Sequence, residues 1–296
     1  MKTKKKKIGT IILIIICFVG LCALLYPTVA NYWNANLRSR DLNDYVAELA
    51  NVSEEDYQKY WQEAIQFNED MKAASYPFTL PGDLQERYEQ CLNINGSGIM
   101  GYIEVPKIDV SLPLYHGTSN SVLSIAIGHL EWTSLPTGGE GTHCCVSGHR
   151  GLASAKLFTD LDRLREGDQF TLNILDEVLT YEVDQIRTVL PHELSDLAVD
   201  PDRDYCTMIT CTPYGINTHR LLVRGHRVAT VGPEVHVVSE AVLIDNLMVA
   251  MFLAIPILFL LLMAVMLKKP EKKPDLSLPL AELLEVKPDA KNKKDQ

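Results

Sequence analysis

The chain has 296 residues, of which 47% are hydrophobic, and its formal net charge is −10, which leaves room for one medium-sized domain beside its terminal segments. Both ends are rich in lysine, so the negative charge is concentrated in the central region. An acidic central region argues against nucleic-acid binding, which needs a basic footprint. It also argues against simple electrostatic docking on anionic lipid.

The N-terminal residues favour a membrane anchor. Residues 1–7 carry five lysines and precede an uncharged apolar run at residues 8–27. A helix of that length can cross a bilayer core of roughly 30 Å. A cleaved signal peptide is the alternative, with residues 28–30 as its cleavage site, but the apolar run is long for a signal peptide. We therefore predict an uncleaved transmembrane helix.

A second apolar run, at residues 242–267, ends in Lys268 and Lys269. Its length and its terminal lysines favour a transmembrane helix over a buried core helix. Both predicted spans have their lysines on the side of the chain ends, so the positive-inside rule predicts cytoplasmic termini and an extracellular region between the spans. The tail at residues 268–296 is charged and is predicted to be disordered.

The first part of the extracellular region is predicted to be a helical lead-in at residues 31–74. Ser53 is followed by three acidic residues, a pattern typical of a helix start, where a hydroxyl caps the first turn and acids favour the positive end of the helix dipole. Residues 75–98 follow as a loop and linker, because two prolines and a glycine at positions 77–82 interrupt regular structure.

Residues 99–230 are mainly β. Short runs rich in Val, Ile, Thr and Tyr are separated by turn residues, and seven or eight of them in one domain predict a closed or nearly closed barrel. The predicted strands are Gly101–Val105, Val122–Ile127, Thr142–Ser147, Gln169–Leu175, Val178–Leu190, Tyr205–Thr210 and His219–Val228.

Seven cysteines occur in the chain, and two of them, Cys17 and Cys22, lie in the first apolar run. Five remain outside, and this odd number leaves at least one external thiol unpaired and open to a reactive role. Buried packing is the expectation for four of them, which are Cys91, Cys144, Cys145 and Cys206.

Three residues are candidates for catalysis. Cys211 ends a predicted strand beside a turn, where a thiol can be held firmly and still be reached, although a buried inert cysteine fits the same position. His149 lies between two nearby glycines, and imidazole is the usual proton carrier near neutral pH. Arg220 begins the last strand, where a permanent cation can stabilise an oxyanion or simply form a surface ion pair.

A metal site is a competing chemical interpretation. His143, Cys144, Cys145 and His149 are close in sequence, but they lack the paired spacing of zinc ligands. We therefore predict neither a metal nor a cofactor.

Taken together, these motifs resemble a known enzyme family. Residues 207–211 (TMITC), with Arg220 nine positions later and His149 upstream, resemble the sortase signature. Residues 211–227 and the block 147–151 (SGHRG) are similar to the class C, pilin-polymerising branch. The resemblance covers residues 100–228 and implies a closed eight-stranded sortase barrel with short helices, a helical lead-in and two flanking transmembrane helices.

The resemblance also implies a mechanism. Cys211 would attack the Thr-Gly bond of an LPxTG-like sorting signal and form a thioester, while His149 would transfer protons. Arg220 would hold the substrate and the oxyanion, and Thr210 would line the site. A lysine amine of a second pilin subunit would then resolve the thioester, at a Gram-positive cell surface and without a cofactor.

Class C members carry a lid with an Asp-Pro-aromatic motif over the active site. Its counterpart here is Tyr76, Pro77 and Phe78, which keeps the proline and the aromatic but has tyrosine in place of the acid. The missing carboxylate removes the expected ionic contact of the lid with Arg220. The resemblance still implies an aromatic plug over Cys211, formed by Phe78.

Three other functions compete with this hypothesis. A housekeeping sortase would attach surface proteins to a cell-wall precursor, which the second span and the lid argue against. A non-catalytic membrane-anchored scaffold would use the barrel as a binding module. A thiol oxidoreductase is disfavoured because no Cys-x-x-Cys motif occurs.

Overall fold

The computed structural model describes residues 2–76, 78–230, 254 and 258. The chain divides into two units, Met1–Val242 and Leu243–Gln296. The predicted second span at 242–267 and the predicted tail at 268–296 lie outside the described residues, apart from Ala254 and Leu258. All the helices and strands with assigned bounds belong to the first unit.

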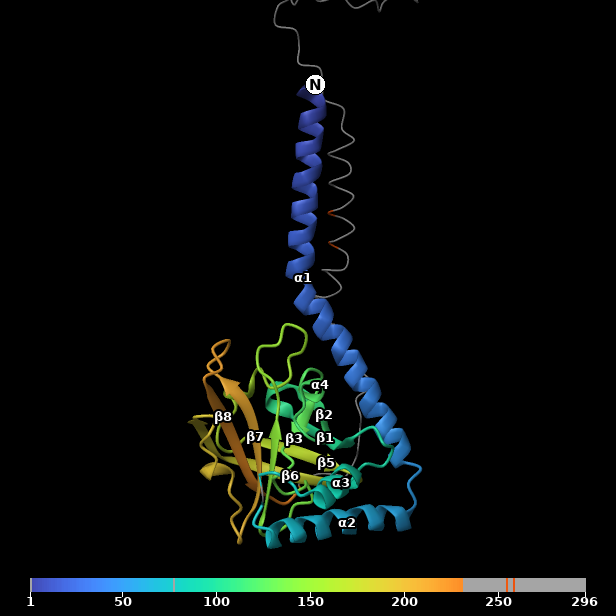
Figure 1. Cartoon of the computed structure of the whole chain (residues 1–296), viewed down its shortest axis with the longest axis vertical. Helices are drawn as coiled ribbons and strands as arrows, with labels where there is room; N and C mark the ends of the chain where they lie inside the picture. Colours follow the sequence, from blue (N-terminus) through green and yellow to red (C-terminus); the bar gives the residue numbers. More distant parts are fainter. Residues whose placement is uncertain (1, 77, 231–253, 255–257, 259–296) are drawn as a thin grey trace, which may run out of the picture. The chain divides into compact units, whose positions relative to one another are not determined.

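Helices form the N-terminal part of this unit (Figure 1). They are α1 (Lys2–Leu49), α2 (Glu54–Ala73) and α3 (Gly82–Gln90). Ser53 caps α2 as its sequence predicts, because the Ser53 side chain accepts a hydrogen bond from the backbone of Asp56. The predicted lead-in is therefore two helices separated by a short turn, and its first helix is continuous with the apolar run.

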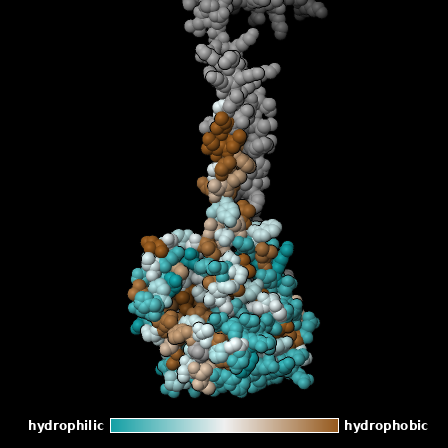
Figure 2. Space-filling view, in the orientation of Figure 1, coloured by the Kyte–Doolittle hydropathy of each residue, from teal (hydrophilic) through white to brown (hydrophobic). Residues whose placement is uncertain are grey.

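The apolar part of α1 is long and hydrophobic enough to cross a membrane, by length and composition, between Ile15 and Leu49. Ile15, Ile16 and Val19 each expose more than half of their surface, and Figure 2 shows apolar side chains gathered on this segment. Side chains that are both apolar and exposed are suited to lipid, but a signal sequence passes the same test.

The remaining elements form a closed eight-stranded barrel, as the sequence predicts. The strands are β1 (Ile99–Val105), β2 (Val110–Tyr115), β3 (Ile127–His129), β4 (Thr142–Ser147), β5 (Gln169–Ile174), β6 (Glu177–Val189), β7 (Asp204–Thr212) and β8 (His219–Arg227). Their order around the barrel is β1-β2-β3-β4-β7-β8-β6-β5. Short helices connect them: α4 (Asn120–Leu123), η1 (Pro106–Ile108), η2 (Leu161–Arg163) and η3 (Ser195–Leu197).

Two details of the strand prediction are wrong. The predicted strand Val122–Ile127 is instead the end of the helical turn α4, a short turn at 124–126 and the first residue of β3, because Ser119 accepts a hydrogen bond from the backbone of Val122 and caps the helical turn. Strand β2 was not predicted, since Pro113 lies inside it and proline disfavours strand interiors. Proline is tolerated here because β3 pairs with β2 only at Leu114 and Tyr115, which leaves the edge open at Pro113.

Two of the barrel's pairings are parallel, β2 with β3 and β4 with β7. The second one matters for the site, because β4 and β7 end at the same edge of the sheet with Ser147 beside Ile209. Alternate residues of β7 face opposite sides of the sheet. Cys206 and Met208 lie in the main core, whereas Ile209 belongs to a small apolar cluster on the outer face.

A buried asparagine of helix α2 is hydrogen-bonded to the β3–β4 connection. Asn68 is 3% exposed and donates to Leu135 O and to Thr137 Oγ1. Its Oδ1 accepts from Leu135 N at 2.7 Å. The side chain thus satisfies both backbone groups of one buried residue in the β3–β4 connection.

We expect Asn68→Ala to lower the free energy of unfolding by about 2 kcal/mol, since the change leaves the buried N–H of Leu135 without its acceptor, while Leu135 O still accepts from Thr137 N. Thermal unfolding of the full chain in detergent measures this effect. Asn51→Ala is the control, because Asn51 is exposed in the turn after α1 and its side chain donates to Ala47 O of that helix. Equal stability of the two variants would contradict the role given to Asn68.

Candidate active site

Cys211 and Arg220 lie directly opposite each other on neighbouring antiparallel strands. Side chains of directly opposed residues lie on the same face, with Cβ atoms about 5 Å apart. Cys211 shares the outer face of β7 with Ile209, and both Cys211 and Arg220 are partly exposed. The spacing of nine residues therefore becomes a face-to-face pair through the β7–β8 hairpin.

His149 reaches the same edge from β4. The parallel ladder pairs Ser147 with Ile209 and continues one residue further, where Gly148 N donates to Ile209 O at 3.0 Å. Extending this register by one more residue brings His149 towards Cys211. His149 is also partly exposed, so the three predicted catalytic residues come to one edge of the barrel.

Thr210 differs from its predicted place in the lining of the site. Its side chain is 1% exposed, and its hydroxyl donates to Gly148 O at 2.7 Å. Alternation along β7 directs Thr210 away from the face of Cys211. The hydroxyl instead joins the residue before Cys211 to the residue before His149.

Gly148 is required at this junction by its surroundings. A Cβ atom there would lie 2.7 Å from a ring carbon of Phe158 and 3.0 Å from Ile127. Such contacts are shorter than side chains tolerate, so any larger residue would displace the segment that carries His149.

Arg150 is a neighbour of the site that the sequence did not single out. Its side chain is 8% exposed and pairs with Asp162, and it also donates to Thr212 Oγ1 at 3.3 Å. The guanidinium lies 5.8 Å from the ring centroid of Tyr214. Arg150 thus connects the loop of His149 to the turn after Cys211, and its place beside His149 was the only sequence signal.

The loop that follows His149 is also held by the first helix. Asn34 Nδ2 donates to Ser154 O at 2.9 Å, and Asn31 Oδ1 accepts from Lys156 N at 2.9 Å. Both asparagines lie just beyond the apolar run of α1. The candidate site is therefore braced by the part of the chain next to the predicted membrane anchor.

Two of the predicted lid residues, Tyr76 and Phe78, line a pocket of about 430 Å³. The lining of this pocket is largely apolar. Tyr76, Phe78 and Trp132 contribute aromatic side chains, and Leu194, Leu197, Ala198 and Val199 come from the β6–β7 loop. Leu197 and Trp132 belong to the same apolar cluster as Ile209. Ile209 thus connects the pocket to the strand end that carries Cys211.

The predicted lid residues border this pocket. Phe78 is 62% exposed, and its ring centroid lies 4.9 Å from that of Trp132. The Tyr76 hydroxyl lies 3.1 Å from Ser134 Oγ. The tyrosine that replaces the expected acid is therefore fastened to the β3–β4 connection, while Pro77 lies outside the described residues.

Four of the other cysteines, Cys91, Cys144, Cys145 and Cys206, are buried, as predicted, whereas Cys17 and Cys22 in α1 are exposed. Burial raises the pKa of Cys91 to about 11 and raises that of Cys145. Cys144 lies in the main core whereas Cys145 lies in the outer cluster. Neighbours on opposite faces of β4 cannot share one ion, so Cys144 and Cys145 do not belong to one metal site.

Comparison with known proteins agrees with this geometry. A model of the sortase domain family matches residues 103–228. The crystal structure of sortase C1 from Streptococcus agalactiae is 50% identical, with a TM-score of 0.63, and the match covers 64% of this chain and 99% of that one. Sortase C of Clostridium perfringens, solved with the C-terminal cell wall sorting motif, is 42% identical with a TM-score of 0.58, over 64% and 99% of the two chains.

Among curated proteins, sortase A of Streptococcus agalactiae is 28% identical over 117 residues, which are 38% of this chain. The match spans 47% of that relative, or about half its length. The extent and identity of the structural matches place the chain in a family: it belongs to the sortases. The solved structures that it resembles at 50% and 42% identity are class C sortases.

Proposed function

We propose that this chain is a membrane-anchored cysteine transpeptidase that polymerises pilin subunits outside the cell. The observation that carries the proposal is the direct opposition of Cys211 and Arg220 at the edge of the barrel, beside the segment of His149. A thiol, a proton carrier and a fixed cation at one edge are the groups that acyl transfer needs.

In the first half-reaction, Cys211 Sγ bonds to the threonine carbonyl carbon of an LPxTG-like sorting signal, and the Thr-Gly C–N bond breaks. His149 gives a proton to the departing amine, and Arg220 stabilises the negative charge on the carbonyl oxygen. In the second, a lysine ε-amine of another pilin attacks the thioester and loses a proton to His149. The S–C bond then breaks and an isopeptide bond remains.

The apolar pocket supports a binding role next to this chemistry. Phe78 and Trp132 form an aromatic wall, and Leu194 and Leu197 lie on the β6–β7 loop. We propose that this pocket receives apolar side chains of the sorting signal and that Tyr76–Phe78 acts as the lid. Because Tyr76 is held by Ser134, this lid would be fastened by a neutral contact instead of an ion pair.

Membrane anchoring belongs to the same proposal. The apolar part of α1 is suited to lipid, and lysines flank the outer side of both apolar runs. These features support cytoplasmic termini and an extracellular barrel. Enzyme and substrate on one membrane face would meet at a raised effective concentration.

Intact mass of the full chain in detergent tests the proposal. We expect an LPxTG-type peptide to leave its acyl fragment on the protein, and a lysine-bearing pilin peptide to remove the fragment at least about tenfold faster than a peptide with only an α-amine. Faster transfer to a wall-precursor-type α-amine would favour the housekeeping sortase. If several related peptides leave no adduct, the transpeptidase proposal fails and the scaffold alternative gains.

A further inference from the structure

We propose that His143 is a positioning residue that holds the β6–β7 loop, which forms one wall of the apolar pocket, against strand β7. The inference rests on the proposed function, because it assigns a determinant of peptide binding at the same site. The proposed transpeptidase mechanism does not use His143.

The histidine connects two elements through its ring. It is 1% exposed, and its Nδ1 lies 2.9 Å from Ala198 O while its Nε2 lies 2.7 Å from Thr207 Oγ1. A carbonyl can only accept, so Nδ1 carries the proton and Nε2 accepts from the threonine hydroxyl. The ring therefore bridges the β6–β7 loop and strand β7.

The two contacts have different consequences. Ala198 lines the pocket together with Leu194, Leu197 and Val199, so a bond to its carbonyl fixes that wall. Thr207 precedes Cys211 by four residues on the same face of β7, which is roughly 13 Å along the strand. His143 thus lies too far from the thiol to act in the chemistry.

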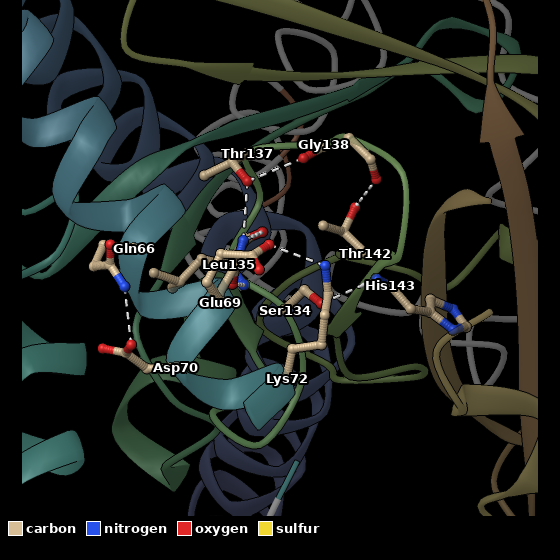
Figure 3. A network of polar contacts seen from close by, with 12 residues as sticks. Gln66, Glu69, Asp70, Lys72, Ser134, Leu135, Thr137, Gly138, Thr142 and His143 are labelled. Atoms are coloured by element: carbon tan, nitrogen blue, oxygen red, sulfur yellow. Dashed lines mark hydrogen bonds and ion pairs between the residues drawn. The ribbon is translucent and has the colours of Figure 1, made fainter. Parts of the chain in front are cut away.

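The part of the pocket that Tyr76 lines is held through Ser134. Ser134 lies beside the backbone of His143 (Figure 3). His143 N donates to Ser134 Oγ at 3.0 Å, and Ser134 N donates to His143 O at 3.1 Å. Ser134 Oγ in turn contacts the hydroxyl of Tyr76. The ring of His143 extends away from Ser134. The backbone of His143 therefore supports the part of the pocket lined by Tyr76, and its side chain supports the β6–β7 loop.

Burial keeps the ring neutral, in the state that both contacts need. Desolvation lowers the pKa of His143, and the nearby cation of Arg224 lowers it too, while the Ala198 carbonyl and Asp184 oppose the shift. A neutral imidazole offers one donor and one acceptor, which match the carbonyl and the hydroxyl that face it.

The test compares His143→Leu with His116→Leu in the full chain in detergent. His116 is a matched control, since both of its ring nitrogens also make polar contacts, to Gly98 O and Cys91 O, and its half-buried ring lies away from the pocket. Loss of two hydrogen bonds should raise the KM for an LPxTG-type peptide about tenfold in His143→Leu. Its kcat should stay within about threefold, and His116→Leu should keep the wild-type KM.

Hydrogen exchange provides a readout that does not depend on activity. Amides of residues 194–199 should exchange about tenfold faster in His143→Leu than in wild type, and Thr207→Val should accelerate them less. Unchanged exchange in this loop, or a KM within twofold of wild type, would overturn the inference. If wild type cleaves no peptide, the proposed function fails, and the exchange data still decide whether His143 holds the loop.

Discussion

Replacing Cys211 by alanine is expected to abolish the acyl adduct and to reduce peptide cleavage by at least about 10³-fold. The thiol is the nucleophile of the first half-reaction, and its neighbours His149 and Arg220 can bind substrate but cannot form a thioester. Cys211→Ser should also lose most of the activity, because a hydroxyl is a much weaker nucleophile near neutral pH. Intact mass and steady-state cleavage of an LPxTG-type peptide measure both effects.

The matched control is Cys91→Ala. Cys91 is a buried thiol whose sulfur lies 3.8 Å from Glu63 O, in the contact between α2 and α3. Removing it should cost some stability and leave the adduct in place. A Cys211→Ala protein that still carries the acyl fragment would exclude Cys211 as the nucleophile and direct attention to another side chain.

Much of the barrel is readable from sequence because its strands are rich in β-branched residues bounded by turns. β4 and β8 were predicted to within one residue of their ends. β2 was missed because Pro113 is unfavourable in most strands, and only its open edge next to β3 makes it acceptable. That edge depends on the length of another strand, which a local pattern does not contain.

The candidate site, too, could be predicted from the sequence only in part. Cys211 and Arg220 could be paired from sequence because one hairpin joins them, and a motif marks His149. Contacts between distant segments left no local pattern, and these include Tyr76 with Ser134, His143 with Ala198, and Asn34 with Ser154. The lid shows the limit clearly, since the missing acid was visible but the new partner of Tyr76 was not.

The sequence predicts that Thr210 lines the site, but the structure buries its side chain. A residue next to the nucleophile in sequence lies on the opposite face of a strand, so adjacency argues against a shared cavity. The hydroxyl of Thr210 contacts Gly148 O instead. This contact links the two parallel strands at the level of Cys211 and His149, the predicted catalytic residues.

Thr210→Val is therefore expected to lower kcat about 10–100-fold, with a smaller change in KM, although Thr210 would touch no substrate. The substitution keeps the shape but removes the donor to a buried carbonyl, which costs about 1–3 kcal/mol. The Gly148 segment can then shift, and a displacement of about 1 Å between reacting groups can cost 10²-fold in rate. Steady-state kinetics with an LPxTG-type peptide measures the change.

Two further variants separate positioning from stability. Thr210→Ser keeps the hydroxyl and should retain kcat within about threefold. Thr180→Val removes another buried hydroxyl, which contacts Thr230 on a different part of the barrel, and should lower stability without lowering kcat. If Thr210→Val keeps the wild-type kcat, the link to Gly148 does not set the geometry of His149 and Cys211. If Thr210→Ser falls as far as Thr210→Val, the hydroxyl is not the cause, and the methyl group's packing inside the barrel becomes the explanation.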